Sequence, residues 1–275
     1  MNPSPPLLTL RRVRMTIFIY YLCSMLSFPN AKINLGLHVL RKREDGFHEI
    51  ETVFYPIDMH DSLEIRPAVQ TTFNFSGPEL AEGENIVLKA SHLMGQEYGI
   101  PPVEIHLLKH IPAGAGLGGG SSDAAHSLVM LNDLFKLDIS PAELEILAAE
   151  LGSDCAFFIR NKPALASGRG ELLEDIDLDL SGYEIKVIKP DIHISTPEAY
   201  GMVKPMDVRP SLREIIQKPV HEWKEVMVND FEKPIFEKYP EIREHKESLY
   251  AQGAVYASMS GSGSAIYGIF TSKML

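Results

Sequence analysis

Residues 112–125 read Pro-Ala-Gly-Ala-Gly-Leu-Gly-Gly-Gly-Ser-Ser-Asp-Ala-Ala, and this stretch guides the interpretation of the whole chain. Its five glycines within seven residues allow positive φ angles and a close approach of the backbone to a ligand. The stretch follows an alternating apolar pattern at 103–111 and opens into a helical pattern, so it joins a strand to a helix. Backbone N–H groups and a helix N-terminus then point at one place, which suits phosphate oxygens.

We therefore predict a phosphate-binding loop. The residues expected to contact phosphate are Pro112, Ala113, Gly114, Ala115, Gly116, Leu117, Gly118, Gly119, Gly120, Ser121 and Ser122. Ser121 and Ser122 also have the hydroxyl groups that cap a helix, and either could bind Mg²⁺.

Two familiar phosphate-binding motifs do not fit this loop. A Walker A loop carries Lys before the first Ser, where this chain has Gly120. Gly114, Gly116 and Gly119 match the spacing of a dinucleotide-binding fingerprint. That fingerprint requires an acidic residue at the end of the next strand, whereas Asp133 falls within the predicted helix. The protein-kinase motifs are absent from the sequence, and a purely structural glycine turn remains the alternative.

The overall composition excludes several classes of protein. The chain has 275 residues, 45% hydrophobic and 23% charged, which is enough for one large domain or two ordinary ones. Its 26 Lys and Arg against 37 Asp and Glu give a net charge of −11. This balance argues against a nucleic acid polymer or an anionic membrane as partner. Two cysteines, Cys23 and Cys155, exclude a disulfide framework and favour a reduced, cytoplasmic setting.

The first 24 residues differ from the rest. Arg11, Arg12 and Arg14 precede an apolar stretch from Met15 to Leu26, which is similar to a secretory signal but lacks a small-residue cleavage site. The stretch is shorter than the roughly 20 residues that span a bilayer. Three interpretations stay open: a start codon placed too far upstream, an extension that is disordered or touches a membrane, and a true signal. We expect the first, with residues 1–24 as a leader outside the fold.

The remaining sequence predicts an α+β protein. Strands are expected at 28–40, 47–56, 61–67, 103–111, 156–159, 184–188, 254–259 and 266–270. Helices are expected at 85–98, after the glycine loop, at 141–151, and at 211–217, 221–230 and 240–252. Asp45-Gly46 is a hairpin signal, and Ser140 with Glu143 forms a capping box before the stop at Gly152.

An acidic stretch that ends in Ser-Gly, at residues 175–182, indicates a domain boundary. We therefore predict an N-terminal domain over residues 25–180 and a C-terminal domain over residues 181–275.

Three motifs in sequence order resemble those of the GHMP kinase family. They are Pro-Asn-Ala-Lys-Ile-Asn-Leu-Gly-Leu at 29–37, the loop at 112–125, and Met-Ser-Gly-Ser-Gly-Ser-Ala at 259–265. The resemblance implies a two-domain α+β fold, with a ribosomal protein S5 domain 2-like N-terminal domain that binds ATP. A ferredoxin-like C-terminal domain would hold the substrate. It also implies ATP with Mg²⁺ as cofactor, a small-molecule acceptor, a cytoplasmic location, and a monomer or weak homodimer.

Within the family, three shorter stretches resemble one branch: residues 29–35, Asp-Gly-Phe-His at 45–48, and Leu-Gly-Ser-Asp at 151–154. That branch phosphorylates the 2-hydroxyl of an erythritol derivative linked to a cytidine diphosphate group, in the non-mevalonate isoprenoid pathway. Two departures leave local turns open. Asn30 lengthens the usual Pro-Ala-Lys, and Cys155-Ala156 replaces the usual Val-Pro.

The resemblance implies roles for individual residues. Lys32 and Asp154 would be catalytic, with the ammonium keeping the carboxylate ionised and binding the transferring phosphoryl group. On spacing alone Asp154 could instead be a surface helix cap, and Lys32 a strand lysine whose head reaches water.

The remaining roles concern the two ligands. Phe47 would stack on cytosine and His48 would hydrogen-bond its edge, with core packing as the alternative for Phe47. Asn34 and Thr196 would contact the acceptor. Asn85 and Lys109 would flank the adenine of ATP, and Ser121 would bind Mg²⁺.

Three other functions compete with this interpretation. The nearest is another kinase of the same family, acting on mevalonate or homoserine. The Phe47-His48 pair argues against it, because only a cytidine gives that pair a purpose. A non-catalytic nucleotide sensor is opposed by the presence of both Lys32 and Asp154. A dinucleotide-dependent oxidoreductase would use the G-x-G-x-x-G match.

Overall fold

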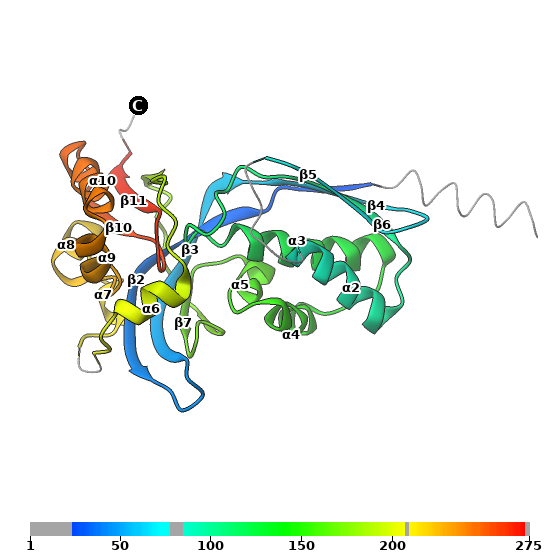
Figure 1. The fold of residues 1–275 in the computed structure, drawn as a ribbon, viewed down its shortest axis with the longest axis horizontal. Helices are drawn as coiled ribbons and strands as arrows, with labels where there is room; N and C mark the ends of the chain where they lie inside the picture. The colour runs from blue at the N-terminus through cyan, green and yellow to red at the C-terminus, as the bar shows by residue number, and fades with distance from the viewer. Residues whose placement is uncertain (1–23, 78–84, 207–208, 273–275) are drawn as a thin grey trace, which may run out of the picture.

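The structure is a computed structural model that describes residues 24–77, 85–206 and 209–272 (Figure 1). All but the last residue of the predicted leader, 1–24, therefore lie outside the described residues. The described chain forms three sheets flanked by helices. No helix in these ranges combines the length and the apolar character that crossing a bilayer requires.

The first sheet belongs to the N-terminal half. Its order is β1 (Met25–Ser27), β4 (Ser62–Pro67), β6 (Val103–Leu108) and β5 (Thr72–Ser76). The strands β5 and β6 run parallel, and α2 (Ile86–Tyr98) connects them, because parallel neighbours need a crossover. The strands expected at 61–67 and 103–111 and the helix at 85–98 are confirmed. The short strand β5 was not predicted.

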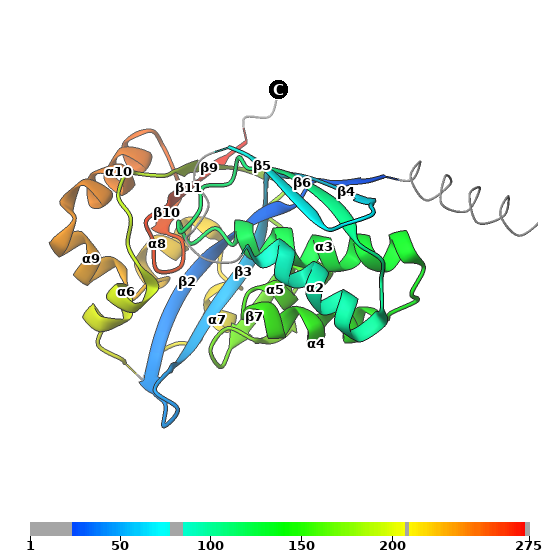
Figure 2. The same ribbon diagram turned by 45° about the vertical axis from the view of Figure 1, so that its right-hand side comes forward.

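The second sheet carries the long hairpin that the Asp45-Gly46 signal predicted. It consists of β2 (Asn30–Lys42), β3 (His48–His60), β7 (Ala164–Ser167) and β8 (Leu172–Asp175). Figure 2 shows β2 and β3 running between the N-terminal helices and the C-terminal elements. Residues Asn30–Val39 are buried on both faces of β2. Because side chains alternate along a strand, one face carries Lys32 and Asn34 and the other carries Ile33 and Leu35.

Helices α2 to α5 lie on one side of the first sheet (Figure 1). They include α3 (Gly119–Phe135), α4 (Pro141–Leu151) and α5 (Cys155–Arg160). The capping box of α4 and its end at Gly152 are confirmed. The strand expected at 156–159 is wrong, because this short apolar run forms the buried helix α5, and periodicity alone does not distinguish the two.

The C-terminal half contains an antiparallel sheet in the order β10 (Tyr256–Met259), β11 (Ile266–Thr271) and β9 (Tyr183–Ile188). Its helical segments are α6 (Thr196–Met202), α7 (Leu212–Ile215), η1 (Val220–Glu222), α8 (Trp223–Val226), α9 (Glu232–Lys238) and α10 (Pro240–Ala251). The strands near 184–188, 254–259 and 266–270 are confirmed. The helix expected at 221–230 is shorter and ends at Val226, while α6 and α9 were not predicted.

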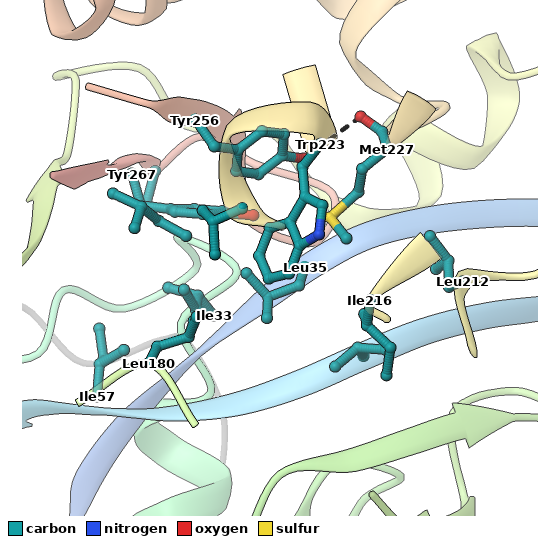
Figure 3. Packing of buried hydrophobic residues seen from close by; sticks show 14 of the residues in the cluster. Ile33, Leu35, Ile57, Leu180, Leu212, Ile216, Trp223, Met227, Tyr256 and Tyr267 are labelled. Carbon is teal, nitrogen blue, oxygen red and sulfur yellow. Dashed lines mark hydrogen bonds between the residues drawn. The ribbon is translucent and has the colours of Figure 1, made fainter. Parts of the chain in front are cut away.

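One hydrophobic cluster joins the two halves (Figure 3). Ile33 and Leu35 of β2 pack in this cluster with Trp223 and Tyr256, whose rings meet edge to face at 5.8 Å. Leu180, at the predicted boundary, is itself buried in the cluster. This hydrophobic cluster is therefore continuous across the predicted domain boundary. The division of the chain into domains at residue 180 stays a prediction.

The half-buried His126 of α3 gives a testable dependence of stability on pH. His126 Nδ1 lies 2.7 Å from Ser27 Oγ, while Nε2 is buried without a partner among the described residues. Burial, and to a smaller extent the charge of His60, lowers the pKa of His126 from 6.5 to about 4. Below pH 6.5 the His126 imidazole binds a proton in the unfolded chain, whereas in the folded protein it stays neutral down to about pH 4. The unfolding free energy should therefore fall by about 3 kcal/mol as the pH drops from 6.5 to 4.

Urea unfolding of His126→Gln and wild type between pH 4.5 and 7 measures this contribution. The difference between the two proteins should shrink as the pH falls, because only wild type loses this part of its stability. His221→Gln, on the surface, is the matched control. If wild type and His126→Gln show parallel pH profiles, this account of His126 is wrong.

Candidate active site

A cavity of about 770 Å³ lies where the glycine loop, the β2–β3 hairpin, α6 and the β10–β11 turn meet. Nine of the nineteen site residues predicted from the sequence line it. They are Lys32, Asn34, Phe47, His48, Gly114, Gly116, Gly118, Asp154 and Thr196. The other ten do not line it: Asn85, Lys109, Pro112, Ala113, Ala115, Leu117, Gly119, Gly120, Ser121 and Ser122.

The glycine loop turns alternate residues toward the cavity and toward the core. Gly114, Gly116 and Gly118 line the cavity with φ angles of 62°, 78° and 71°. Such left-handed angles are costly for residues with a side chain. Between them, Ala115 and Leu117 are buried in the shared cluster. The loop is therefore anchored by two apolar side chains and presents bare backbone to a ligand.

The carbonyl groups of this loop are engaged by the protein. Leu117 O accepts from Lys32 N at 2.9 Å, and Ala115 O accepts from Ala265 N at 3.1 Å. Gly116 O accepts from Ser260 Oγ at 2.8 Å and from Lys32 Nζ at 3.2 Å. At residues 115–117 the loop therefore offers a ligand its N–H donors rather than its carbonyl groups, as a polyphosphate requires.

Helix α3 begins directly at this loop, with Gly118 as its N-cap and no side-chain cap bond. The prediction that Ser121 or Ser122 caps the helix is therefore wrong, since both lie inside the first turn. Ser122 is fully buried, and its Oγ has no partner among the described residues. Ser121 lies near the buried Cys155 thiol, whose pKa burial raises to about 12. The first amides of α3 lack a side-chain cap, and an anionic ligand can supply one.

Lys32 and Asp154 form an ion pair at the cavity, with Nζ and Oδ2 3.2 Å apart. The Lys32 side chain is only 4% exposed, while that of Asp154 is 34% exposed. The ammonium also donates to Asn34 Oδ1 at 2.6 Å and lies 4.7 Å from the centre of the Phe54 ring. Asp154 is at the N-cap position of α5 but makes no cap bond. Its carboxylate is thus held on one side by a fixed cation and open to the cavity on the other.

Asn34 is the residue that fixes this cation. Its Oδ1 accepts from Lys32, its Nδ2 donates to Thr52 Oγ1 at 3.0 Å, and its backbone N donates to Ser260 Oγ at 3.2 Å. These bonds tie the ammonium to β3 and to the β10–β11 turn. Asn34 is only 2% exposed, so its main visible role is to orient Lys32.

Aromatic side chains also line the cavity. His48 stacks on Tyr200 with ring centres 4.8 Å apart, and Tyr200 meets Phe231 edge to face. Phe47 stands beside them, 55% exposed. Burial, and to a smaller extent the charge of Lys42, lowers the pKa of His48. Its neutral ring has one donor and one acceptor nitrogen. Burial and then the charge of Asp154 raise the pKa of Tyr200 to about 12, so its phenol stays neutral.

Tyr200 was missed from the sequence because α6 was not predicted. The signal was present: Ser195 caps the helix by accepting from Glu198 N, and Pro197 follows at the start of the helix. Thr196 lines the cavity at the first turn of the same helix.

Lys109 lies beneath the glycine loop rather than in the cavity. Its ammonium is buried between Asp61 and Asp123, and it donates to Asp123 Oδ2 at 2.8 Å. Asp61 Oδ1 also accepts from the backbone N–H groups of His110 and Ile111. Burial raises the pKa of Asp123 to about 7. This triad ties the strand that enters the loop to the helix that leaves it, so the Lys109 side chain is not placed to contact adenine.

Asn85 is the N-cap of α2, where its Oδ1 accepts from Val87 N at 2.8 Å. The next residue, Ile86, faces Gly120, where an added Cβ would come within 3.8 Å of Ile86 Cγ2. The start of α2 therefore stands beside the exit of the glycine loop, although Asn85 itself does not line the cavity.

The profiles of two sequence families match this chain. The one described as "GHMP kinases N terminal domain" matches residues 85–162, and the one described as "GHMP kinases C terminal" matches residues 211–274. The chain belongs to the GHMP kinase family. It follows that this GHMP kinase uses ATP and a small-molecule acceptor, and that the oxidoreductase alternative is wrong. The predicted two-domain α+β fold is confirmed.

Several relatives of this GHMP kinase have a specific name, 4-diphosphocytidyl-2-C-methyl-D-erythritol kinase. The relative from Bacteroides thetaiotaomicron is 53% identical over 252 residues, which cover 90% of this chain and 92% of the relative. The relative from Parabacteroides distasonis is 54% identical over 248 residues, with the same coverage.

Solved structures agree with this grouping. The crystal structure of a 4-(cytidine 5'-diphospho)-2C-methyl-D-erythritol kinase superposes with a TM-score of 0.77 at 37% identity, covering 89% of this chain and 90% of that one. A homoserine kinase from Cytophaga hutchinsonii superposes with a TM-score of 0.68 at 17% identity, covering 91% and 86%. The second likeness concerns the fold alone.

Proposed function

We propose that this kinase phosphorylates the 2-hydroxyl of 4-diphosphocytidyl-2-C-methyl-D-erythritol with ATP, giving the 2-phosphate and ADP, in the non-mevalonate pathway to isoprenoid precursors. One observation carries the proposal: a single cavity is lined by both the Lys32–Asp154 pair and the His48–Tyr200 stack. An alcohol joined to a cytidine through a diphosphate has the matching shape. Relatives of about half identity carry the name of this activity.

On the ATP side, the triphosphate lies along the N–H groups of residues 112–122 and the N-terminus of α3. Glycines at 114, 116 and 118 permit the close approach, and the engaged carbonyl groups of Gly116 and Gly118 do not repel the phosphates as free carbonyl oxygens would. Adenine lies beside the start of α2, near Asn85. Lys109 contacts adenine only through its backbone, because its ammonium is buried in ion pairs with Asp61 and Asp123.

Mg²⁺ accompanies ATP in this proposal. The residues present fit an ion that keeps most of its water and phosphate ligands, because among the described residues the cavity wall offers a single carboxylate, that of Asp154. When bound, the ion neutralises charge on the phosphates. Ser121 would be a protein ligand.

Phosphoryl transfer demands mainly positioning and charge neutralisation. The 2-hydroxyl oxygen forms a bond to the γ-phosphorus as the bond from that phosphorus to the β,γ-bridging oxygen breaks. Asp154 orients the hydroxyl and accepts its proton, and Lys32 keeps the carboxylate ionised and stabilises the charge on the moving phosphoryl group. Asn34 acts by fixing Lys32.

Phe47 and Tyr200 provide flat faces for cytosine, and neutral His48 bonds to its edge. Thr196 lies on the acceptor side of the cavity. We assign ATP binding to residues 25–180 and acceptor binding to residues 181–275, with the Phe47-His48 hairpin reaching across. The enzyme acts in the cytoplasm as a monomer or weak homodimer.

A panel of acceptors with Mg-ATP tests the proposal. ADP formation is followed with 4-diphosphocytidyl-2-C-methyl-D-erythritol, mevalonate, homoserine and no acceptor. We expect ADP above background with the first compound alone. Turnover of mevalonate or homoserine at a comparable rate would identify a different kinase of this family. ATP binding without turnover of any acceptor would identify a nucleotide sensor.

A further inference from the structure

Arg169 stands at the turn between β7 and β8, where it lines the cavity. Its neighbours Gly168 and Gly170 have φ angles of 70° and 107°, which make the turn tight. The turn is fastened to β3, because Ile50 N donates to Gly168 O at 2.8 Å and Gly168 N donates to Glu49 Oε1 at 3.2 Å. Arg169 is therefore presented to the cavity by a braced turn.

The guanidinium group lies over the ring of Phe47, with its central carbon 5.0 Å from the ring centre. Stacking on a ring orients the planar guanidinium and leaves its N–H groups at the edge free to bind an anion. The ion pair of Arg169 with Glu171 is long, at 3.5 Å, and the side chain is 42% exposed. Arg169 thus retains donors that its protein contacts do not saturate.

Among the described residues, Lys32 and Arg169 are the lysine and arginine side chains that line the cavity. Lys32 is committed to Asp154, Asn34 and Gly116. Arg169 is the cation left for a second anionic group.

The position of Arg169 indicates which group that is. On one side it touches Phe47, which lines the cavity. On the other side its neighbour Gly170 approaches Asp154, since a Cβ there would lie 3.9 Å from Asp154 Oδ1. A substrate with its cytidine at Phe47 and its hydroxyl group at Asp154 must place its two linking phosphates between these residues. Those phosphates carry two negative charges, which in an acidic protein need a local cation.

We propose that Arg169 binds the diphosphate that links cytidine to the alcohol, and so makes the enzyme select nucleoside diphosphate derivatives over the bare nucleoside. This inference rests on the proposed function and adds a specificity residue to it.

The test compares two ligands, CDP and cytidine, by calorimetric titration of wild type, Arg169→Gln and Arg41→Gln. Arg41 is the matched control because it lies on β2 of the adjacent hairpin with a side chain 69% exposed. Wild type should bind CDP more tightly than cytidine. In Arg169→Gln, the affinity for CDP should fall by about 10- to 100-fold, as expected for a lost charge-assisted contact, while the affinity for cytidine changes by less than about 3-fold.

Steady-state kinetics give a second readout. In Arg169→Gln the KM for the full substrate should rise by a similar factor, with kcat and the KM for ATP unchanged, and Arg169→Lys should recover part of the loss. Equal losses of affinity for CDP and cytidine would show that Arg169 only supports Phe47. Unchanged CDP binding would show that Arg169 has no role in binding the diphosphate. Either outcome overturns the proposal. If wild type turns over the substrate in those cases, the proposed function stands. If wild type does not, it is the proposed function that fails.

Discussion

Asp154→Asn is expected to lower kcat by about 10³-fold, within the range that general acid–base groups contribute, while ATP binding changes by less than about 3-fold. The amide keeps the shape of the side chain but cannot accept the hydroxyl proton, and it loses the charge that pairs with Lys32 at 3.2 Å. Asp154 makes no cap bond to α5, so the helix should survive the change. The fold should therefore stay intact while the chemistry stops.

Single-turnover measurements with saturating Mg-ATP test this expectation, together with binding of a non-hydrolysable ATP analogue. Asp177→Asn, an exposed acidic residue, is the matched control and should behave as wild type. A rate within 10-fold of wild type would remove Asp154 from the reaction. Loss of nucleotide binding would assign it to the ATP site instead.

Gly116→Ala is expected to abolish useful activity, with kcat/KM for ATP reduced by about 100-fold or more. A Cβ at this position would lie 2.0 Å from the carbonyl oxygen of Ser260, a distance that forces backbone to move. The φ of 78° adds the cost of a left-handed conformation. The glycine loop or the β10–β11 turn must shift, and a displacement of about 1 Å at a catalytic site can cost about 10²-fold.

The matched control for this variant is Gly95→Ala in the middle of α2. An added Cβ there meets nothing within 4 Å, and alanine favours a helix over glycine by about 1 kcal/mol. Thermal unfolding and ATP titration of both variants separate the effects. Gly95→Ala should retain full activity. Near-normal ATP affinity in Gly116→Ala would mean that the loop does not hold the phosphates.

The local parts of this fold could be predicted because their signals are local. The hairpin follows from alternation around Asp45-Gly46, and α4 from Ser140 and Glu143 three residues apart. The glycine loop between β6 and α3 follows from its composition and its flanking patterns. The error at 156–159 has the same origin, because a run of a few apolar residues fits a strand and a buried helix equally well.

Contacts between distant segments could not be predicted in this way. Family resemblance predicts Lys109 beside adenine, but its ammonium is paired in the interior with Asp61 and Asp123, 48 and 14 positions away. Tyr200 and Arg169 were not predicted as site residues, because their closeness to the cavity also depends on contacts between distant segments. Each reaches the cavity from a segment that sequence patterning did not resolve. The closeness of Lys32 to Asp154 was expected from family resemblance and not from spacing.

The most direct test compares an acceptor that carries the cytidine monophosphate portion with one that lacks it. Initial rates of ADP formation are measured with 4-diphosphocytidyl-2-C-methyl-D-erythritol and with 2-C-methyl-D-erythritol 4-phosphate, which lacks the cytidine monophosphate portion. Because one cavity holds both the Lys32–Asp154 pair and the His48–Tyr200 stack, kcat/KM should be at least about 10³-fold higher for the cytidine compound. Equal values for the two acceptors, or no ADP from either, would contradict the account.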